Sequence, residues 1–129
     1  MRSLDEQSHN LIQKILNEIK PFVYVVGSVA EGTDDDFSDI DFYVKLKPQS
    51  ELDKEIEANF YSLDGIDESY LEKIIDVLND YKIKWSSSVI SYITTENAPV
   101  QLEFSTLFNI KNKTTSTVSV YGVKMNCYK

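Results

Sequence analysis

Two aspartates in alternate positions, Asp39 and Asp41, are the residues of this chain best suited to chemistry. They open the apolar run "DIDFYVKL", and on a β-strand residues i and i+2 project from the same face. Two adjacent carboxylates repel one another until a proton or a cation relieves the repulsion. A hard divalent cation such as Mg²⁺ takes oxygen ligands and keeps positions open for water and phosphate oxygens. The spacing predicts a metal clamp, although a solvated strand start is the alternative interpretation of an isolated D-x-D.

A Gly-Ser pair, Gly27 and Ser28, ends the preceding apolar run "FVYVVG", ten residues before Asp39. Glycine lets the backbone turn tightly, and serine adds a hydroxyl and an N–H. If residues 28–32 begin a helix, its first N–H groups favour an anion. For Gly-Ser alone the alternative is an ordinary turn. Together, the turn and the aspartates predict a phosphate cradle beside a metal clamp, which is the equipment for a metal-bound triphosphate.

Helices and strands must position these residues, and the surrounding pattern predicts both. Helices are expected over 3–19, with Ser3 and Glu6 at capping-box spacing, over 51–59 after Ser50, and over 67–81. Strands are expected over 22–27, 39–46, 83–93 with an optional hairpin turn near Ser87, and 99–108, followed by a hairpin over 117–129 about Gly122. We therefore expect an α+β fold, with helices packed on a small mixed sheet.

Composition limits the class of protein. The chain has 129 residues, and we expect a single domain over residues 1–129 with one core. The formal net charge of -8 argues against a surface that grips long nucleic acid, although the excess acid can also serve solubility alone. One cysteine, Cys127, suits a reducing cytoplasm. No apolar run approaches the ~20 residues of a membrane span, so no membrane partner is expected.

The stretch "GSVAEGTDDDFSDIDFYV" carries a family resemblance. It resembles the signature G-S-x10-D-x-D of the DNA polymerase β-type nucleotidyltransferase superfamily, and the short chain is similar to minimal nucleotidyltransferase (MNT-like) domains. Gly32 and Ser38 also fall where that family often has Gly and Ser. The resemblance implies that Gly27, Ser28 and Ser38 bind nucleotide. It also implies a small mixed sheet flanked by helices and transfer of a nucleoside monophosphate from an NTP, with release of pyrophosphate.

The family also needs a third carboxylate on a later strand, and Glu103 in "PVQLEFS" is the candidate. Apolar Leu102 and Phe104 flank it, so it is an acid on an otherwise apolar segment. Its alternation partners Gln101 and Ser105 are polar, and a solvent-facing side of the strand is therefore the alternative interpretation. The family position is more often Asp, so the longer glutamate is a departure from the pattern.

The resemblance implies a two-metal phosphoryl transfer in which Asp39, Asp41 and Glu103 are both the catalytic and the metal-binding residues. One Mg²⁺, held by all three carboxylates, would lower the pKa of the acceptor hydroxyl. A second Mg²⁺, held by Asp39 and Asp41, would bind the triphosphate, and Mn²⁺ is an alternative metal. Glu103 could also take the proton of the acceptor.

A second departure lies inside the signature. Many small members carry a basic residue between the Ser and the second Gly, where this chain has Val29-Ala30-Glu31. An acid near a triphosphate repels it, so either Glu31 points away or a lysine from elsewhere compensates. The available lysines, each of which is also an ordinary surface residue by pattern, are Lys45, Lys47, Lys111 and Lys113.

These observations favour a Mg²⁺-dependent enzyme that transfers AMP from ATP to a hydroxyl of a protein or small-molecule acceptor. One alternative is a catalytically weak or inactive module of the same fold that binds a partner protein, as an antitoxin does. Another is an antibiotic nucleotidyltransferase, since an acidic pocket suits a cationic aminoglycoside. A homo-oligomer, and excision of the chain from a longer protein, stay open as well.

Overall fold

The computed structural model of the protein describes residues 1–48, 50–51, 69–89 and 92–129. Its helices are α1 (Glu6–Ile19), the 3₁₀ turn η1 (Lys20–Phe22), α2 (Gly27–Glu31) and α4 (Leu71–Asp80). Its strands are β1 (Val23–Val26), β2 (Ile40–Val44), β3 (Trp85–Val89), β4 (Tyr92–Thr95), β5 (Leu102–Ser105), β6 (Thr115–Val120) and β7 (Val123–Tyr128). Most of the helix predicted over 51–59 lies outside the described residues. None of the described helices is long and apolar enough to cross a membrane.

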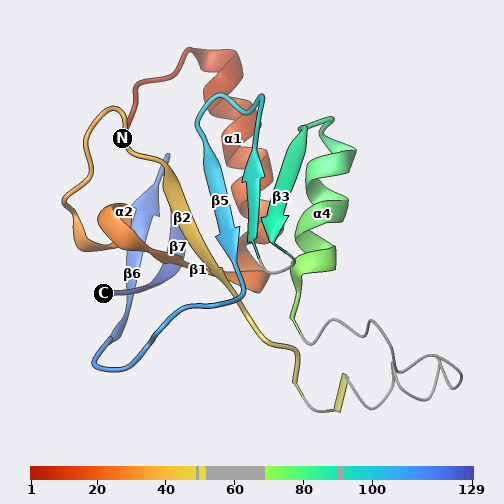
Figure 1. The fold of residues 1–129 in the computed structure, drawn as a ribbon. Helices are drawn as coiled ribbons and strands as arrows, with labels where there is room; N and C mark the ends of the chain where they lie inside the picture. Colours follow the sequence, from red (N-terminus) through yellow and green to blue (C-terminus); the bar gives the residue numbers. More distant parts are fainter. Residues whose placement is uncertain (49, 52–68, 90–91) are drawn as a thin grey trace, which may run out of the picture.

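The described strands form one mixed sheet in the order β3-β4-β5-β2-β1-β7-β6 (Figure 1). Strands β1 and β2 are antiparallel, whereas β2 and β5, and likewise β1 and β7, are parallel. The remaining neighbours, β3–β4, β4–β5 and β6–β7, pair antiparallel. Helices α1 and α4 pack beside one another on one face of the sheet. The predicted α+β fold, a small mixed sheet flanked by helices, is therefore confirmed.

Alternation along the central strands separates a buried apolar face from a partly exposed, more polar one. On β2, Ile40, Phe42 and Val44 are buried, while Asp41 and Tyr43 between them are only partly buried. The same pattern holds on β5, where Leu102 and Phe104 are buried and Glu103 and Ser105 are partly exposed. The rings of Phe42 and Phe104 stack with centroids 5.0 Å apart. The apolar sides of α1 and α4 complete this core, chiefly through Ile12, Ile15, Leu16, Ile19, Leu71, Ile74 and Leu78.

Two local predictions were wrong. Helix α1 begins at Glu6 rather than Ser3, and its N-cap is Asp5, whose carboxylate accepts a hydrogen bond of 2.8 Å from the Ser8 N–H. An aspartate at this position satisfies a free N–H of the first turn, so the capping box at Ser3 is not used. The hairpin turn also does not lie near Ser87. That residue is inside β3, and its hydroxyl donates to the Tyr92 carbonyl at 2.8 Å.

Candidate active site

Gly27 makes the turn from β1 into α2 with a φ of +72°. Residues with a Cβ rarely adopt this backbone conformation, whereas glycine does so without steric cost. Space is a second reason, because a Cβ at this position would lie 2.7 Å from Oδ2 of Asp41. The backbone at Gly27 therefore lies so close to the Asp41 carboxylate that only glycine fits there. Ser28 follows, partly buried, in the first turn of α2, as the sequence predicts.

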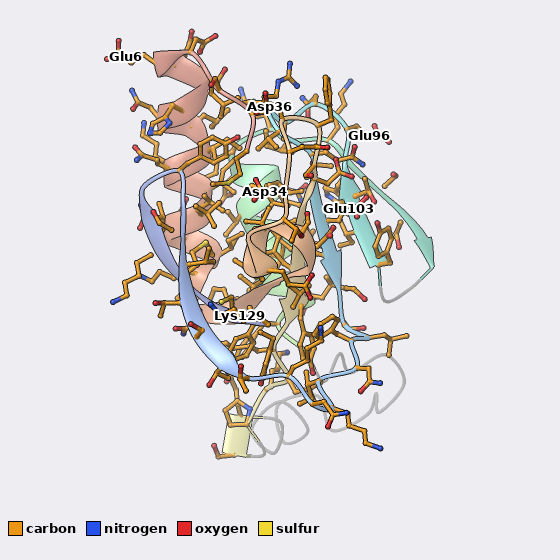
Figure 2. The ribbon with its side chains drawn as sticks, turned by 90° about the vertical axis from the view of Figure 1, so that its left-hand side faces the viewer. Glu6, Asp34, Asp36, Glu96, Glu103 and Lys129 are labelled. Carbon is orange, nitrogen blue, oxygen red and sulfur yellow. The ribbon has the colours of Figure 1, made fainter. Side chains whose placement is uncertain are left out.

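Asp41 and Glu103 are direct neighbours in the sheet. The parallel pairing of β2 with β5 sets Asp41 opposite Glu103, and on its other side Asp41 pairs with Val26. Adjacent strands lie ~4.8 Å apart, so paired residues project side by side from one face. Asp39 lies two residues before Asp41, just ahead of β2. Figure 2 shows Glu103 on the side of the sheet that faces away from α1. The structure thus brings together the three carboxylates predicted from the sequence.

Burial and neighbouring acids raise the affinity of Asp39 and Asp41 for protons. The pKa of Asp41 is raised to about 7 by burial, by a hydrogen bond with Glu103, and by the charges of Glu103 and Asp39. The pKa of Asp39 is also raised, first by burial and then by the charge of Glu103 and a hydrogen bond with it. Glu103 therefore interacts with both aspartates. On β4, burial raises the pKa of Tyr92, and Glu103 adds to that shift, which places this phenol beside the carboxylates too.

The donor set suits a hard divalent cation. In the part of the chain that the structure describes, no three acidic, His or Cys side chains already enclose a metal-sized space. Instead, hydrogen bonds with Glu103 are among the causes of the raised pKa of both aspartates. A divalent cation would replace the shared proton and relieve the same repulsion, since carboxylate oxygens are the ligands that Mg²⁺ prefers. By donor chemistry, the three residues fit a magnesium site.

Asp35 organises the loop that leads from α2 to β2. Its carboxylate accepts hydrogen bonds from the Phe37 N–H at 2.9 Å and from the Ser38 hydroxyl at 3.1 Å. The same hydroxyl accepts a bond of 3.0 Å from the Asp35 N–H. The bond from Phe37 and then those from Ser38 lower the pKa of Asp35. Ser38 therefore stabilises the loop just ahead of Asp39, and its role in nucleotide binding stays a prediction.

Lys113 is the lysine that the fold brings to the signature. Its Nζ lies 3.4 Å from Oε1 of Glu31, and both side chains are partly exposed. The acid that departs from the family pattern therefore has a cation beside it. The other candidates lie elsewhere: the ammonium of Lys45 sits 4.6 Å from the ring centre of Tyr24, Lys47 is buried, and Lys111 is exposed.

A hollow of about 490 Å³ adjoins Asp39, and its lining includes Arg2, Phe37 and Gln101. Sequence reasoning did not single out Arg2 or Phe37. For Phe37 a signal was present, because it is an aromatic residue in an otherwise polar and acidic run over 33–39. For Arg2 no local signal exists, because tertiary packing alone brings the first residues of the chain to this loop.

A mixed sheet with a Gly-Ser turn next to three carboxylates is the arrangement expected of a domain that transfers nucleotidyl groups. The comparison with protein families agrees: the model of the nucleotidyltransferase domain matches residues 10–100, and the chain belongs to this family. The match includes Gly27, Ser28, Asp39 and Asp41, while Glu103 lies just beyond it. No curated protein and no solved structure matches the chain.

Proposed function

We propose that the protein is a Mg²⁺-dependent nucleotidyltransferase that moves AMP from ATP to a hydroxyl of a protein or small-molecule acceptor. The observation that carries this proposal is the register of β2 and β5, which sets Glu103 beside Asp41 with Asp39 two residues away. Family membership supports nucleotidyl transfer in general. In the reaction the acceptor oxygen forms a bond to the α-phosphorus, and the bond from that phosphorus to pyrophosphate breaks.

Each carboxylate has a role in this proposal. Asp39 and Asp41 would hold the cation that the triphosphate requires, while Glu103 would complete the ligand set and accept the proton of the acceptor hydroxyl. When bound, two Mg²⁺ or Mn²⁺ ions would neutralise part of the charge of the triphosphate and lower the pKa of the attacking hydroxyl. Because the pKa of Asp41 is raised to about 7, protons compete with the cation at and below neutral pH.

The phosphates need donors and positive charge as well. A Cβ at Gly27 would lie 2.7 Å from Oδ2 of Asp41, so this turn adjoins the carboxylate, and its N–H groups are the proposed donors to the phosphates. Ser28 adds its hydroxyl next in the chain. Lys113 is held at Glu31 at the other end of α2, and this pairing keeps Glu31 from acting as an uncompensated negative charge.

A second candidate function is a module that binds a partner protein with little or no turnover. The observation that favours it is the exposure of two large apolar side chains in the segment between β5 and β6, where Leu107 is 75% and Ile110 45% exposed. The two side chains lie three positions apart in the chain, and exposed apolar groups that form one patch are typical of surfaces that a partner covers. Such a module would keep its partner affinity after Asp39→Asn or Asp41→Asn.

The first experiment measures the thermal midpoint of unfolding with each of the four NTPs, with and without Mg²⁺. A ligand that binds only the folded state raises the midpoint, by an amount equivalent to ~2.7 kcal/mol at a hundredfold excess over Kd. We expect a Mg²⁺-dependent shift with ATP, which Asp41→Asn abolishes. Asp76→Asn removes an exposed carboxylate of α4 and serves as the matched control.

Turnover then needs its own measurement. We expect the wild type to release pyrophosphate from ATP when its acceptor is supplied, and Asp41→Asn to release none. A shift in the wild type that survives in Asp41→Asn would contradict the assignment of the carboxylates. The absence of any nucleotide-dependent shift in the wild type would contradict catalysis by this chain and favour the protein-binding module.

A further inference from the structure

The hollow beside Asp39 has the size and lining of a binding site. Its volume of about 490 Å³ falls within the ~300–1,000 Å³ typical of small-molecule pockets. Its lining includes an aromatic residue, Phe37, a cation, Arg2, and an amide, Gln101, together with Asp36 and Ser38. Asp39 also lines the hollow, which therefore adjoins one of the three proposed metal ligands.

Phe37 is held in solvent by the structure of its loop. Its side chain is 93% exposed, although burial of an aromatic ring of this size is normally favourable. The bond of 2.9 Å from its N–H to the Asp35 carboxylate, together with the bonds between Asp35 and Ser38, fixes the backbone on which it stands. The ring is therefore a preformed flat apolar surface at the rim of the hollow.

Two further lining residues, Gln101 and Arg2, are held in place by backbone hydrogen bonds. The backbone carbonyl of Gln101 accepts a bond of 3.0 Å from the Ile40 N–H, which ties this residue to the start of β2 next to Asp39. The backbone carbonyl of Arg2 accepts a bond of 2.6 Å from the Tyr121 hydroxyl. An amide that both donates and accepts, and a planar guanidinium, are groups that can read the edge of a heterocycle or stack on it.

We propose that this hollow binds the base of the nucleotide substrate, with Phe37 as its stacking platform and Gln101 and Arg2 at the edge of the base. The inference rests on the proposed function, because a base reaches the hollow only if its α-phosphate lies at Asp39 and Asp41. An aromatic ring suits a base because stacking requires only a π-face. The proposed occupant is the nucleoside part of the NTP.

The test compares ligands with and without a base. Binding of ATP and of inorganic triphosphate, both with Mg²⁺, is measured for the wild type, Phe37→Ala and Phe37→Trp. We expect Phe37→Ala to weaken ATP binding about tenfold, as loss of one base–aromatic stack does, while binding of inorganic triphosphate is unchanged. Phe37→Trp should restore ATP binding. Leu107→Ala, which removes another exposed apolar side chain, is the control and should change neither affinity.

The outcomes separate this inference from the proposed function. If the wild type binds inorganic triphosphate as tightly as ATP, or if Phe37→Ala weakens both ligands equally or neither, the hollow does not hold the base, and the inference is overturned while the proposed function stands. If the wild type binds neither ligand, both are overturned. Because Phe37 is exposed, an unchanged thermal midpoint without ligand is expected for Phe37→Ala and confirms that the variant is folded.

Discussion

Asp41 on β2 and Glu103 on β5 lie opposite one another across a parallel strand pair, although some sixty residues separate them in the chain. Parallel neighbours need a crossover connection, and here the connection includes α4 and the β3–β4 hairpin. The pairing forces two acids into hydrogen-bond contact at the sheet surface. This contact exists only in the folded protein, so the proton it holds links stability to pH.

Stability should fall as the pH rises through neutrality. In the folded protein the pKa of Asp41 is about 7, against 3.8 for an ordinary aspartate. The stability that this proton contributes is therefore fully present below about pH 4 and is lost as the pH rises through 7. A fully buried group with this shift would contribute ~4 kcal/mol. Because the Asp41 carboxyl is only partly buried, screening reduces this to about 1–2 kcal/mol.

Asp41→Asn should remove most of this pH dependence and raise the free energy of unfolding at pH 8. Urea unfolding at pH 5.5 and at pH 8 measures the effect. Asp76→Asn, on the exposed side of α4, should leave the dependence as it is in the wild type. If the wild type has the same free energy of unfolding at both pH values, the contact between Asp41 and Glu103 does not hold a proton.

Gly27→Ala should damage both the fold and the site, whereas Gly32→Ala should damage the fold alone. Both glycines have a positive φ, +72° and +74°, so an alanine costs on the order of 1 kcal/mol of backbone strain at each. Only at Gly27 would the new Cβ meet a carboxylate, 2.7 Å from Oδ2 of Asp41, because Gly32 has nothing within 4 Å. We therefore expect a larger loss of stability in Gly27→Ala, together with loss of Mg²⁺-dependent ATP binding.

Thermal unfolding with and without Mg²⁺ and ATP tests the pair of glycine variants. Gly32→Ala serves as the matched control, because it carries the same backbone strain without the steric contact. Equal loss of ATP binding in the two variants would show that backbone strain in α2, and not the space beside Asp41, controls the site.

Lys113→Ala should weaken the binding of ATP severalfold, with little change in stability. The ion pair of Lys113 with Glu31 is partly exposed, so it contributes less than about 1 kcal/mol to folding. Its loss leaves Glu31 uncompensated within the proposed phosphate-binding segment. Lys111→Ala changes an exposed lysine two residues away and should have no such effect. Titration of both variants with ATP at two salt concentrations measures the difference, and equal affinities would contradict the pairing as a contributor to the site.

Glu103→Gln should abolish turnover while nucleotide binding persists. Loss of a general base lowers the rate by ~10²–10⁴-fold, and Asp39 and Asp41 would still hold a cation. The variant also removes the charge that raises the pKa of Asp41, so this pKa should fall. Pyrophosphate release and an NMR titration of Asp41 report these two effects, with Glu96→Gln as an exposed control. Full activity in Glu103→Gln would exclude its proposed role.

Local patterns in the sequence were sufficient to predict the strands and the turn that carry the candidate site. The alternation in "DIDFYV" predicts which face Asp41 occupies, and the apolar neighbours of Glu103 predict its strand. Both follow from the two-residue repeat of a β-strand, which needs no knowledge of the rest of the fold. The turn at Gly27 could be predicted for the same reason, since a glycine after a buried strand allows a sharp change of direction.

Relationships between distant segments could not be predicted in this way. No local sequence pattern predicts that β5 rather than another strand lies beside β2. Nor does one predict that Lys113 pairs with Glu31, or that Arg2 lines a hollow next to Asp39. These contacts depend on the packing of the whole sheet. The N-cap of α1 at Asp5 was missed for a local reason. Ser3 and Asp5 are both good N-cap residues, and only the structure shows which of them is used.

The strand order also determines when during folding the acidic cluster can form. β1 lies between β2 and β7, and its contact with β7 joins Val25 to Cys127, about a hundred residues apart. The Asp41–Glu103 neighbourhood requires a second long-range pairing. Long-range strand pairing pays its loop-closure entropy before it gains contacts, so it comes late and makes folding slow. We therefore expect the acidic cluster to be completed late in folding, because the two aspartates lack Glu103 beside them until β5 pairs with β2.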